Sequence, residues 1–225
     1  MDHLWSGFQA STTSLTRLLL LRDLLCCQFM WHTSYRGHDT GKLRLRDFRD
    51  PRGGGPFRGF PLPLPDPFGA YPSLSLRIEQ LGTKTSKGRR APPLELRPDP
   101  SPRHCFLRTL ALYWQLCHAP DAPPGSAISD YLFRPTDRGH QRFVERPFSS
   151  SALAMRVGKH LEEAGVYVGQ TPHGFRRGTI QATQAAGASR AELHAFSQIR
   201  SAQVLERYTD ASRPTRVPRG SGPRS

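Results

Sequence analysis

The sequence predicts a mainly helical single domain with one small antiparallel sheet, and three observations lead to this fold class. Apolar residues recur at helical spacing in several segments spread over the 225 residues. Strict alternation of apolar and polar residues is confined to two short neighbouring segments, as in a β-hairpin. The chain holds 20 glycines and 21 prolines, so much of the rest must be loop.

The N-terminal part predicts one long helix followed by irregular chain. Residues 13–34 carry apolar side chains at near-helical spacing behind a Thr-Thr-Ser N-cap, which indicates a helix. Residues 35–48 contain a turn and a second short element. Residues 49–72 are rich in proline and glycine, so we interpret them as a long loop or insertion. Residues 1–12 are interpreted as a linker or the remnant of an N-terminal domain.

A β-hairpin and a series of helices follow. Residues 73–81 and 93–97 alternate around a basic turn, Gly-Thr-Lys-Thr-Ser-Lys-Gly-Arg-Arg. Glycines after two of the later helices provide stop signals, at positions 165 and 187. The domain is expected to span residues 13–211, and residues 212–225 to form a disordered basic tail. Helices are predicted over residues 103–118, 149–164, 171–186, 189–196 and 202–208.

The charge favours an acidic partner. The formal net charge is +14, and all but four of the 32 cations are arginine, which makes nucleic acid the leading candidate. Cations are spread along the chain rather than clustered, which disfavours a membrane surface. The apolar run near residues 18–25 contains Arg22 and Asp23 and cannot span a bilayer.

The cysteines and carboxylates do not indicate a metal centre. The four cysteines form no CxxC pair, so we interpret them as reduced thiols of an intracellular protein. The carboxylates are scattered, unlike the clustered acids of a metal-dependent nuclease. The sequence therefore predicts neither a metal ion nor another cofactor.

One segment combines groups that suit a phosphate. His173 and Arg176 are three residues apart and share a face of the predicted helix. Arginine can contact a phosphate through two N–H groups, and histidine can donate a hydrogen bond or act as a general acid or base. Taken alone, the segment favours the simpler interpretation of a surface histidine and a salt-bridged arginine.

Further motifs, taken in order, resemble the tyrosine recombinase (phage-integrase-like) family. That family carries an arginine after a buried helix, with an acid three, a leucine seven and an aspartate eleven residues later. A hairpin lysine beside threonine follows, then an H-x-x-R box, a helix break at glycine, and a nucleophilic tyrosine. The resemblance covers residues 15–210, and the segments YLF and TPHGFRRG are closest to recombinases of DIRS-type or Crypton-like mobile elements. The matching residues are Arg36, Asp39, Leu43, Asp47, Lys84, His173, Arg176, Gly187 and Tyr208.

The resemblance implies the catalytic-domain fold of the family, a reaction and a role for each residue. The reaction is site-specific DNA recombination or integration through a 3′-phosphotyrosyl intermediate, without metal or ATP. Tyr208 would be the nucleophile and His173 would take or share its proton. Arg36 and Arg176 would hold the non-bridging phosphate oxygens, and Lys84 would protonate the leaving 5′-oxygen.

Supporting roles and partners follow from the same resemblance. Asp39 would support Arg36, although Arg36 could instead simply neutralise Asp39 or Asp47. Lys87 is the alternative to Lys84 as the acid. The expected partners are double-stranded DNA and further copies of the chain, as a tetramer, and the expected location is the nucleus if the source is eukaryotic. Contacts to the DNA backbone are assigned to Lys87, Arg89, Arg90 and Arg177.

Two departures leave a second interpretation open. The family usually has a histidine or tryptophan where this chain has Ile199, preceded by Gln198, and the nearby His194 is out of register. The helical DNA-clamping domain that normally precedes the catalytic domain has no counterpart in residues 1–12. The alternative is a degenerate or truncated recombinase that acts only as a basic DNA-binding module. A type IB topoisomerase shares the chemistry and would relax supercoils without sequence choice.

Overall fold

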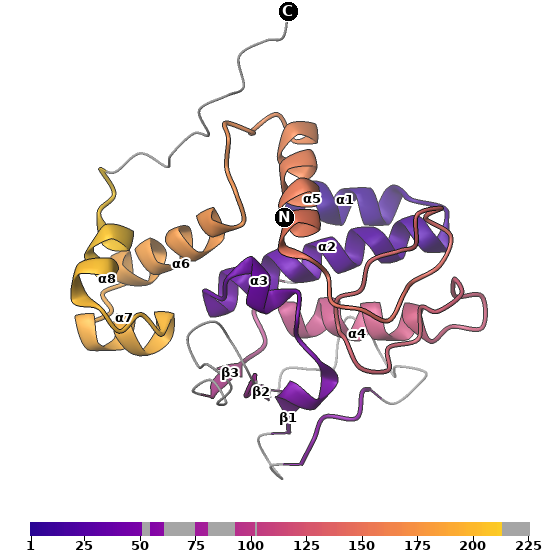
Figure 1. Ribbon diagram of the computed structural model, residues 1–225, viewed down its shortest axis with the longest axis horizontal. Helices are drawn as coiled ribbons and strands as arrows, with labels where there is room; N and C mark the ends of the chain where they lie inside the picture. Colours follow the sequence, from indigo (N-terminus) through magenta and orange to yellow (C-terminus); the bar gives the residue numbers. More distant parts are fainter. Residues whose placement is uncertain (51–54, 61–74, 81–92, 102, 213–225) are drawn as a thin grey trace, which may run out of the picture.

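The computed structural model describes residues 1–50, 55–60, 75–80, 93–101 and 103–212. These residues form a mainly helical structure with one three-stranded antiparallel sheet, so the predicted fold class is confirmed (Figure 1). The elements are α1 (Asp2–Ala10), α2 (Ser14–Thr33), α3 (Gly37–Thr40), η1 (Leu45–Asp47), β1 (Phe48–Arg49), β2 (Leu76–Ile78), β3 (Leu94–Leu96), α4 (Phe106–Cys117), α5 (Ser150–Glu163), α6 (His173–Ala185), α7 (Arg190–Ser197) and α8 (Ala202–Thr209).

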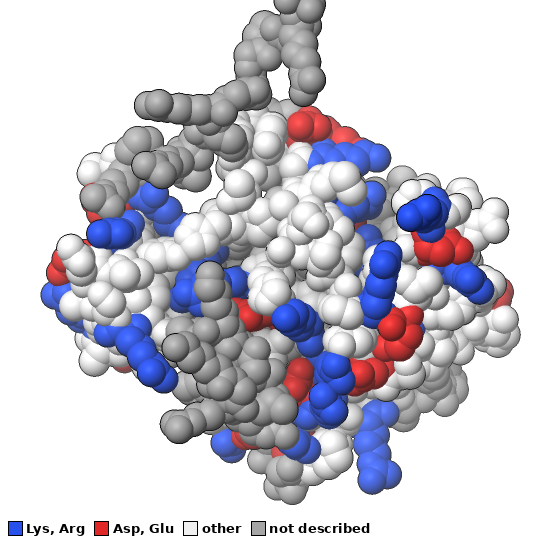
Figure 2. All heavy atoms as spheres, viewed as in Figure 1, with Lys and Arg blue, Asp and Glu red and all other residues white. Residues whose placement is uncertain are grey.

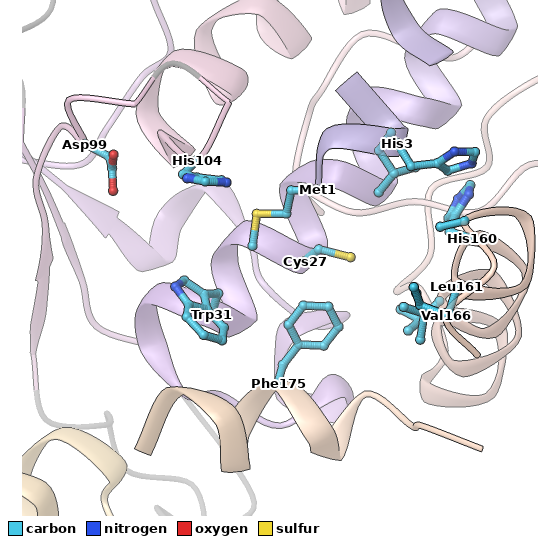
Figure 3. Close-up of a pocket in the computed structure, with 13 residues that line it drawn as sticks. Met1, His3, Cys27, Trp31, Asp99, His104, His160, Leu161, Val166 and Phe175 are labelled. Carbon is cyan, nitrogen blue, oxygen red and sulfur yellow. The ribbon is translucent and has the colours of Figure 1, made fainter. Parts of the chain in front are cut away.

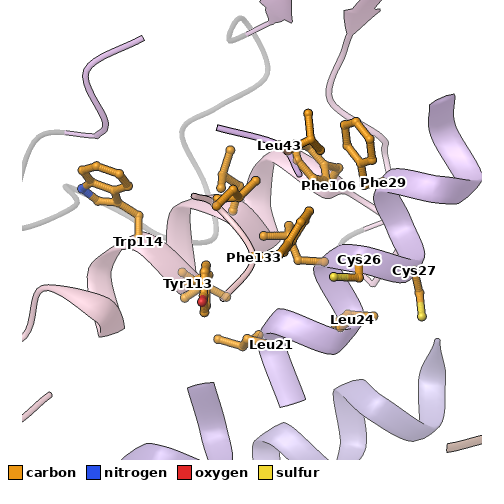
Figure 4. Packing of buried hydrophobic residues seen from close by; sticks show 14 of the residues in the cluster. Leu21, Leu24, Cys26, Cys27, Phe29, Leu43, Phe106, Tyr113, Trp114 and Phe133 are labelled. Carbon is orange, nitrogen blue, oxygen red and sulfur yellow. The ribbon is translucent and has the colours of Figure 1, made fainter. Parts of the chain in front are cut away.

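Helix α2 lies at the centre of the structure. It packs against α4, α1, α5 and α6, and it is buried on most of its circumference. A helix that contacts neighbours on several sides must be apolar nearly all round, which explains its long leucine-rich run. Leu21, Leu24 and Phe29 of α2 lie close to Phe106 and Tyr113 of α4 in the main core (Figure 4).

The N-terminal residues form a helix that the sequence analysis did not name. Helix α1 runs alongside α2 and buries Leu4, Trp5 and Phe8 in the main core (Figure 1). Met1 occupies the N-cap position of α1 and provides no capping side chain, so the sequence carries no start signal for this helix. The interpretation of residues 1–12 as a linker or domain remnant stays a prediction.

The strands of the predicted hairpin are present. β2 and β3 pair in antiparallel register, with Leu76 opposite Leu96 and Ile78 opposite Leu94. The alternation that predicted β2 is visible as burial, because its first and last residues are buried and the middle one is exposed. β1 adds a third strand that pairs Phe48 with Ile78 and is too short to be recognised from sequence. The turn over residues 81–92 lies outside the described residues.

Part of the Pro/Gly-rich segment is packed against the fold. Phe57 and Phe60 contact each other, and the Phe57 ring centroid lies 6.2 Å from that of Trp114. Gly59 has a φ of +99°, and a Cβ there would fall 2.0 Å from the Trp114 ring. Residues 55–60 therefore cover the end of α4, whereas the rest of the predicted insertion lies outside the described residues, apart from Arg49 and Asp50.

The predicted helix ends are found where the sequence placed them. Side chains of Thr13, Ser149 and Ser189 accept hydrogen bonds from backbone N–H groups of the first turns of α2, α5 and α7. Gly165 and Gly187 take left-handed φ values of +69° and +91° after α5 and α6. The predicted tail lies outside the described residues except for its first residue.

The cysteines and the hydropathy of the helices agree with the sequence. All four thiols are free and buried, and burial raises the pKa of Cys27 and that of Cys117 to about 12. Within the described ranges, none of the helices is both long and apolar enough to cross a bilayer.

Candidate active site

Helices α6 and α8 bring the predicted histidine and tyrosine together. The Tyr208 hydroxyl lies 2.7 Å from Nε2 of His173, and the two ring centroids are 5.2 Å apart. Pro172 precedes His173 at the N-cap of α6, and Ser201 caps α8 by accepting a hydrogen bond from the N–H of Val204. Residues 35 positions apart in sequence are therefore joined at one hydrogen bond.

Arg176 lies beneath this pair and is 3% exposed. Its guanidinium carbon is 5.6 Å from the centroid of the Tyr208 ring. One terminal nitrogen donates to the carbonyl of Ser34, and the other donates to the carbonyl of Ser197 at 2.6 Å. Ser34 ends α2 with a left-handed φ of 53°, and Ser197 ends α7. Arg176 thus ties three helices together, and N–H groups remain on its guanidinium because arginine has five.

The surroundings of Arg176 disfavour its positive charge on balance. Burial and the neighbouring Arg36 lower the pKa of Arg176, while Tyr208 and Asp39 oppose this effect. An arginine stays protonated under such a shift, so Arg176 is a fixed positive charge at the site. This charge would attract a phosphate group.

His173 is neutral at neutral pH in this environment. Burial, followed by the charges of Arg176, Arg36 and Arg177, lowers its pKa below the ordinary value. A neutral imidazole with its proton on Nδ1 has a lone pair on Nε2 that can accept from the Tyr208 hydroxyl. The pair is therefore arranged for transfer of the tyrosine proton to histidine.

Arg36 and Asp39 enter the site through α3. Arg36 is the N-cap residue of this helix and follows directly after α2 and Tyr35. Asp39 is buried, and its backbone carbonyl accepts a hydrogen bond of 2.7 Å from Gln80. The Asp39 charge favours protonated Arg176, so it acts on the second arginine of the site. Its predicted support of Arg36 stays a prediction.

Two glycines allow α3 to approach its neighbours. A Cβ at Gly41 would lie 1.9 Å from the carbonyl oxygen of Phe148, and a Cβ at Gly37 would lie 3.3 Å from Pro172, next to His173. The N–H of Phe148 in turn donates to the Gly41 carbonyl at 3.0 Å. The short helix that begins after Arg36 is consequently fixed close to the start of α6.

The predicted DNA-contacting residues are only partly placed. Nη2 of Arg177 donates to the backbone carbonyl of Asp210 at 2.5 Å, just beyond α8, and so holds the end of the tyrosine-bearing helix. On the face seen in Figure 2, Lys and Arg side chains lie over α7 and α8 and where α3 approaches α6. Four predicted residues fall in the turn outside the described part of the chain: Lys84, Lys87, Arg89 and Arg90.

The position where the family has histidine or tryptophan belongs to a small core. Ile199 is 5% exposed and packs with Ile180, Leu193 and Leu205 beneath α6, α7 and α8. His194 is used locally, since its Nδ1 lies 2.6 Å from the Ile199 carbonyl. This isoleucine therefore holds the helices together instead of facing the site with a polar group.

Tyr35 and the backbone acceptors of Arg176 were missed by sequence reasoning, whereas Gln198 was noted there only as the residue before Ile199. The Gln198 side chain lies near the hydroxyl of Tyr35, whose pKa burial raises to about 12. Ser34 and Ser197 contribute backbone carbonyls to Arg176, which no side-chain motif can reveal. The sequence offers one indirect signal for the two side chains, because Tyr35 directly precedes Arg36 and Gln198 directly precedes Ile199.

The comparisons with known proteins concern the fold. No family model and no curated protein matches the chain. A structure of the XerH site-specific recombinase bound to palindromic difH substrate, a post-cleavage complex, is similar, with a TM-score of 0.56, 13% identity, and coverage of 92% of this chain and 47% of that chain. A pre-cleavage complex of XerH with difH substrate gives a TM-score of 0.54 and 12% identity over 92% of this chain and 48% of that chain.

These similarities are structural and cover less than half of the XerH chains. The similarity nevertheless covers 92% of the present chain. The chain therefore has the fold of a tyrosine recombinase catalytic domain.

Proposed function

We propose that the chain cleaves and rejoins DNA strands through a 3′-phosphotyrosyl intermediate at Tyr208, as a site-specific recombinase. The observation that carries the proposal is the 2.7 Å contact between the Tyr208 hydroxyl and His173 Nε2. Buried Arg176 lies directly beside this pair. A nucleophile, a neutral base and a fixed cation in contact are the groups that attack on a phosphodiester requires.

The proposed step balances atoms and charge. The Tyr208 oxygen bonds to the phosphorus while its proton passes to His173. The bond from phosphorus to the 5′-oxygen breaks, and Lys84, or Lys87 in its place, donates the proton that makes a 5′-hydroxyl. The product is a 3′-phosphotyrosyl ester, which a different 5′-hydroxyl then attacks to rejoin the strand and release tyrosine. The ester retains the bond energy, so no nucleotide is consumed.

The cations lower the barrier to this step. Charge grows on the non-bridging oxygens in the transition state, and donors fixed in advance stabilise it without reorganisation. In the proposal Arg36 and Arg176 supply those donors. The carbonyls of Ser34 and Ser197 support this role, since they hold the Arg176 guanidinium beside the Tyr208 ring before DNA binds.

The finer parts of the proposal concern context. We infer from the segments around Tyr131 and His173 that the chain comes from a DIRS-type or Crypton-like mobile element. We further propose that it works on double-stranded DNA as a tetramer, and that it acts in the nucleus if its source is eukaryotic. The net charge of +14 supports binding to DNA that depends strongly on salt.

A second candidate function is supported by one observation. Ile199 is buried in the small core where the family usually has a polar side chain. A chain that lacks that hydrogen bond could bind DNA without cleaving it, as a degenerate or truncated recombinase. The two candidates differ in whether a covalent product forms.

Covalent trapping separates the two candidates. Nicked duplexes taken from the flanks of the element are incubated with the full chain, and a denaturing gel reports protein attached to DNA. We expect an adduct that Tyr208→Phe abolishes while leaving DNA binding nearly unchanged. Tyr167→Phe is the matched control, because Tyr167 is exposed in the loop after α5 and should leave the adduct intact. Salt-sensitive binding with no adduct would favour the binding module.

A further inference from the structure

A cluster of two histidines and a glutamate lies away from the candidate active site, where α1 meets α5. The donor atoms of His3, His160 and Glu163 all lie within 4.8 Å of one another. The His3 and Glu163 side chains are 42% and 41% exposed, whereas His160 is 8% exposed. Two imidazoles and one carboxylate form a ligand set that proteins use for Zn²⁺.

Distances within the cluster fit tetrahedral coordination. Oε2 of Glu163 lies 3.3 Å from Nε2 of His3 and 3.3 Å from Nδ1 of His160. In a tetrahedral site with bonds of about 2.0 to 2.1 Å, two ligand atoms are about 3.3 to 3.4 Å apart. The same separations are long for hydrogen bonds between these groups. If the two histidines moved slightly closer together, His3, His160 and Glu163 would occupy three corners of a tetrahedron.

A buried carboxylate orients the central histidine. Oδ2 of Asp23 lies 2.9 Å from Nε2 of His160, and Asp23 is 2% exposed. Asp23 also accepts hydrogen bonds from Arg22 and Arg156, so its position is fixed. A proton on Nε2 of His160 then leaves the Nδ1 lone pair facing Glu163. Metal-bound histidines usually have such a carboxylate on their second nitrogen.

The Nδ1 lone pair of His160 and the Glu163 carboxylate face each other, so a positive charge is required between them. A second proton on His160 would meet this need, with both ring nitrogens donating to carboxylates. A divalent metal would meet it as well, and it would also hold His3 at the same Glu163 oxygen, 3.3 Å from its Nε2. Lys159 is 3.6 Å from the other oxygen, Oε1, so that Oε2 is left for the histidines.

The cluster also borders an open space. His3 and His160 lie together at one end of a cavity of about 460 Å³, away from His104 and Asp99 (Figure 3). A three-ligand site next to a cavity leaves room for water or another small ligand as the fourth donor.

We propose that His3, His160 and Glu163 bind one Zn²⁺ ion, with Asp23 orienting His160. The ion joins the first turn of α1 to the last turn of α5, and thereby secures a helix that otherwise docks through Leu4, Trp5 and Phe8. Its function is to fix the N-terminal helix on the domain, independently of the chemistry at Tyr208.

The test is calorimetric titration of the full, untagged chain with ZnCl₂. We expect one Zn²⁺ per chain, and His3→Ala and Glu163→Gln should each weaken binding at least about tenfold. Both residues are exposed, so these substitutions should leave folding intact, as far-UV circular dichroism would verify. Glu162→Gln changes the neighbouring exposed glutamate of α5 and should leave the affinity unchanged. With CoCl₂, the unmodified chain should give the visible absorption of tetrahedral Co²⁺. His3→Ala and Glu163→Gln should lack this absorption.

Hydrogen exchange provides a second, structural measurement. Added ZnCl₂ should slow amide exchange across α1 in the unmodified chain and in Glu162→Gln, but not in His3→Ala. Absence of Zn²⁺ binding, or binding that both ligand substitutions leave unchanged, would overturn the proposal and assign the cluster to a protonated His160. Binding without slower exchange in α1 would overturn the proposed joining of α1 to α5.

Discussion

Replacement of Leu205 by alanine tests how the fold holds the tyrosine in place. Leu205 is 2% exposed and belongs to the small core beneath α6, α7 and α8, which is separate from the main core around α2. Helix α8, which carries Tyr208, packs chiefly on α6. The account predicts that the substitution loosens α8 before it unfolds the domain.

The magnitude follows from the size of this cluster. A leucine truncated in a core costs about 2 to 5 kcal/mol. Only four buried residues form the cluster, so neighbours can relax and the lower part of the range, about 2 to 3 kcal/mol, applies. At 1.4 kcal/mol per factor of ten, the undocked population of α8 rises about 30- to 150-fold.

The assay is native-state hydrogen exchange together with covalent trapping. Amides of α8, such as the N–H of Leu205 that donates to Ser201, should exchange faster by that factor, whereas amides of α2 should change much less. Adduct formation should fall if undocked α8 becomes the major state. Leu110→Ala in the main core is the matched control and should lower protection throughout the domain. Uniform loss of protection in Leu205→Ala would refute the reasoning.

Three further predictions concern pH, backbone packing and thiol reactivity. Because the pKa of His173 is lowered, its neutral form persists below pH 6.5. The rate of single-turnover cleavage should therefore rise with pH only in acid and then level off. A rate that falls as pH rises through this range would contradict the role of His173 as base. For the same reason this histidine stabilises the fold above its unfolded pKa and loses that contribution as pH falls, which urea titrations at several pH values would detect. Gly41→Ala should destabilise the chain strongly, because its Cβ would meet the Phe148 carbonyl. Gly174→Ala should instead stabilise α6 by about 0.5 to 1 kcal/mol, because nothing lies within 4 Å of its Cβ. Equal urea midpoints for the two variants would contradict this difference. Cys117 should react with disulfide reagents only after unfolding, since its thiol is buried and its pKa is raised to about 12.

Local patterns were sufficient to predict most of the fold. The long helices carry apolar periodicity, caps and terminal glycines, all of which are local signals, and their bounds agree closely with α2, α4, α5 and α6. The hairpin strands were recognised by alternation. α1 was missed because its N-cap position is Met1, which provides no capping side chain, whereas the equally short α7 and α8 begin at capping serines. β1 was missed because two residues cannot establish an alternation.

The candidate site was predictable in its side chains and not in its supports. The spacing of His173 and Arg176 placed them on one helix face, the resemblance to tyrosine recombinases added Tyr208, and the structure brings the three side chains together. The two carbonyls that hold Arg176 come from residues 142 and 21 positions away in sequence. Backbone acceptors leave no trace in residue type, so this part required the fold. The turn with Lys84 lies outside the described residues, and its role stays a prediction.

The central claim is that Tyr208 becomes covalently joined to DNA. Its most direct test is mass spectrometry of the protein–DNA adduct after digestion with protease and nuclease. The account predicts a nucleotide attached through phosphate to the oxygen of Tyr208, in a peptide from α8, with a free 5′-hydroxyl on the released strand. A phosphate attached to any other residue, or a 5′-phosphate on the released strand, would contradict it.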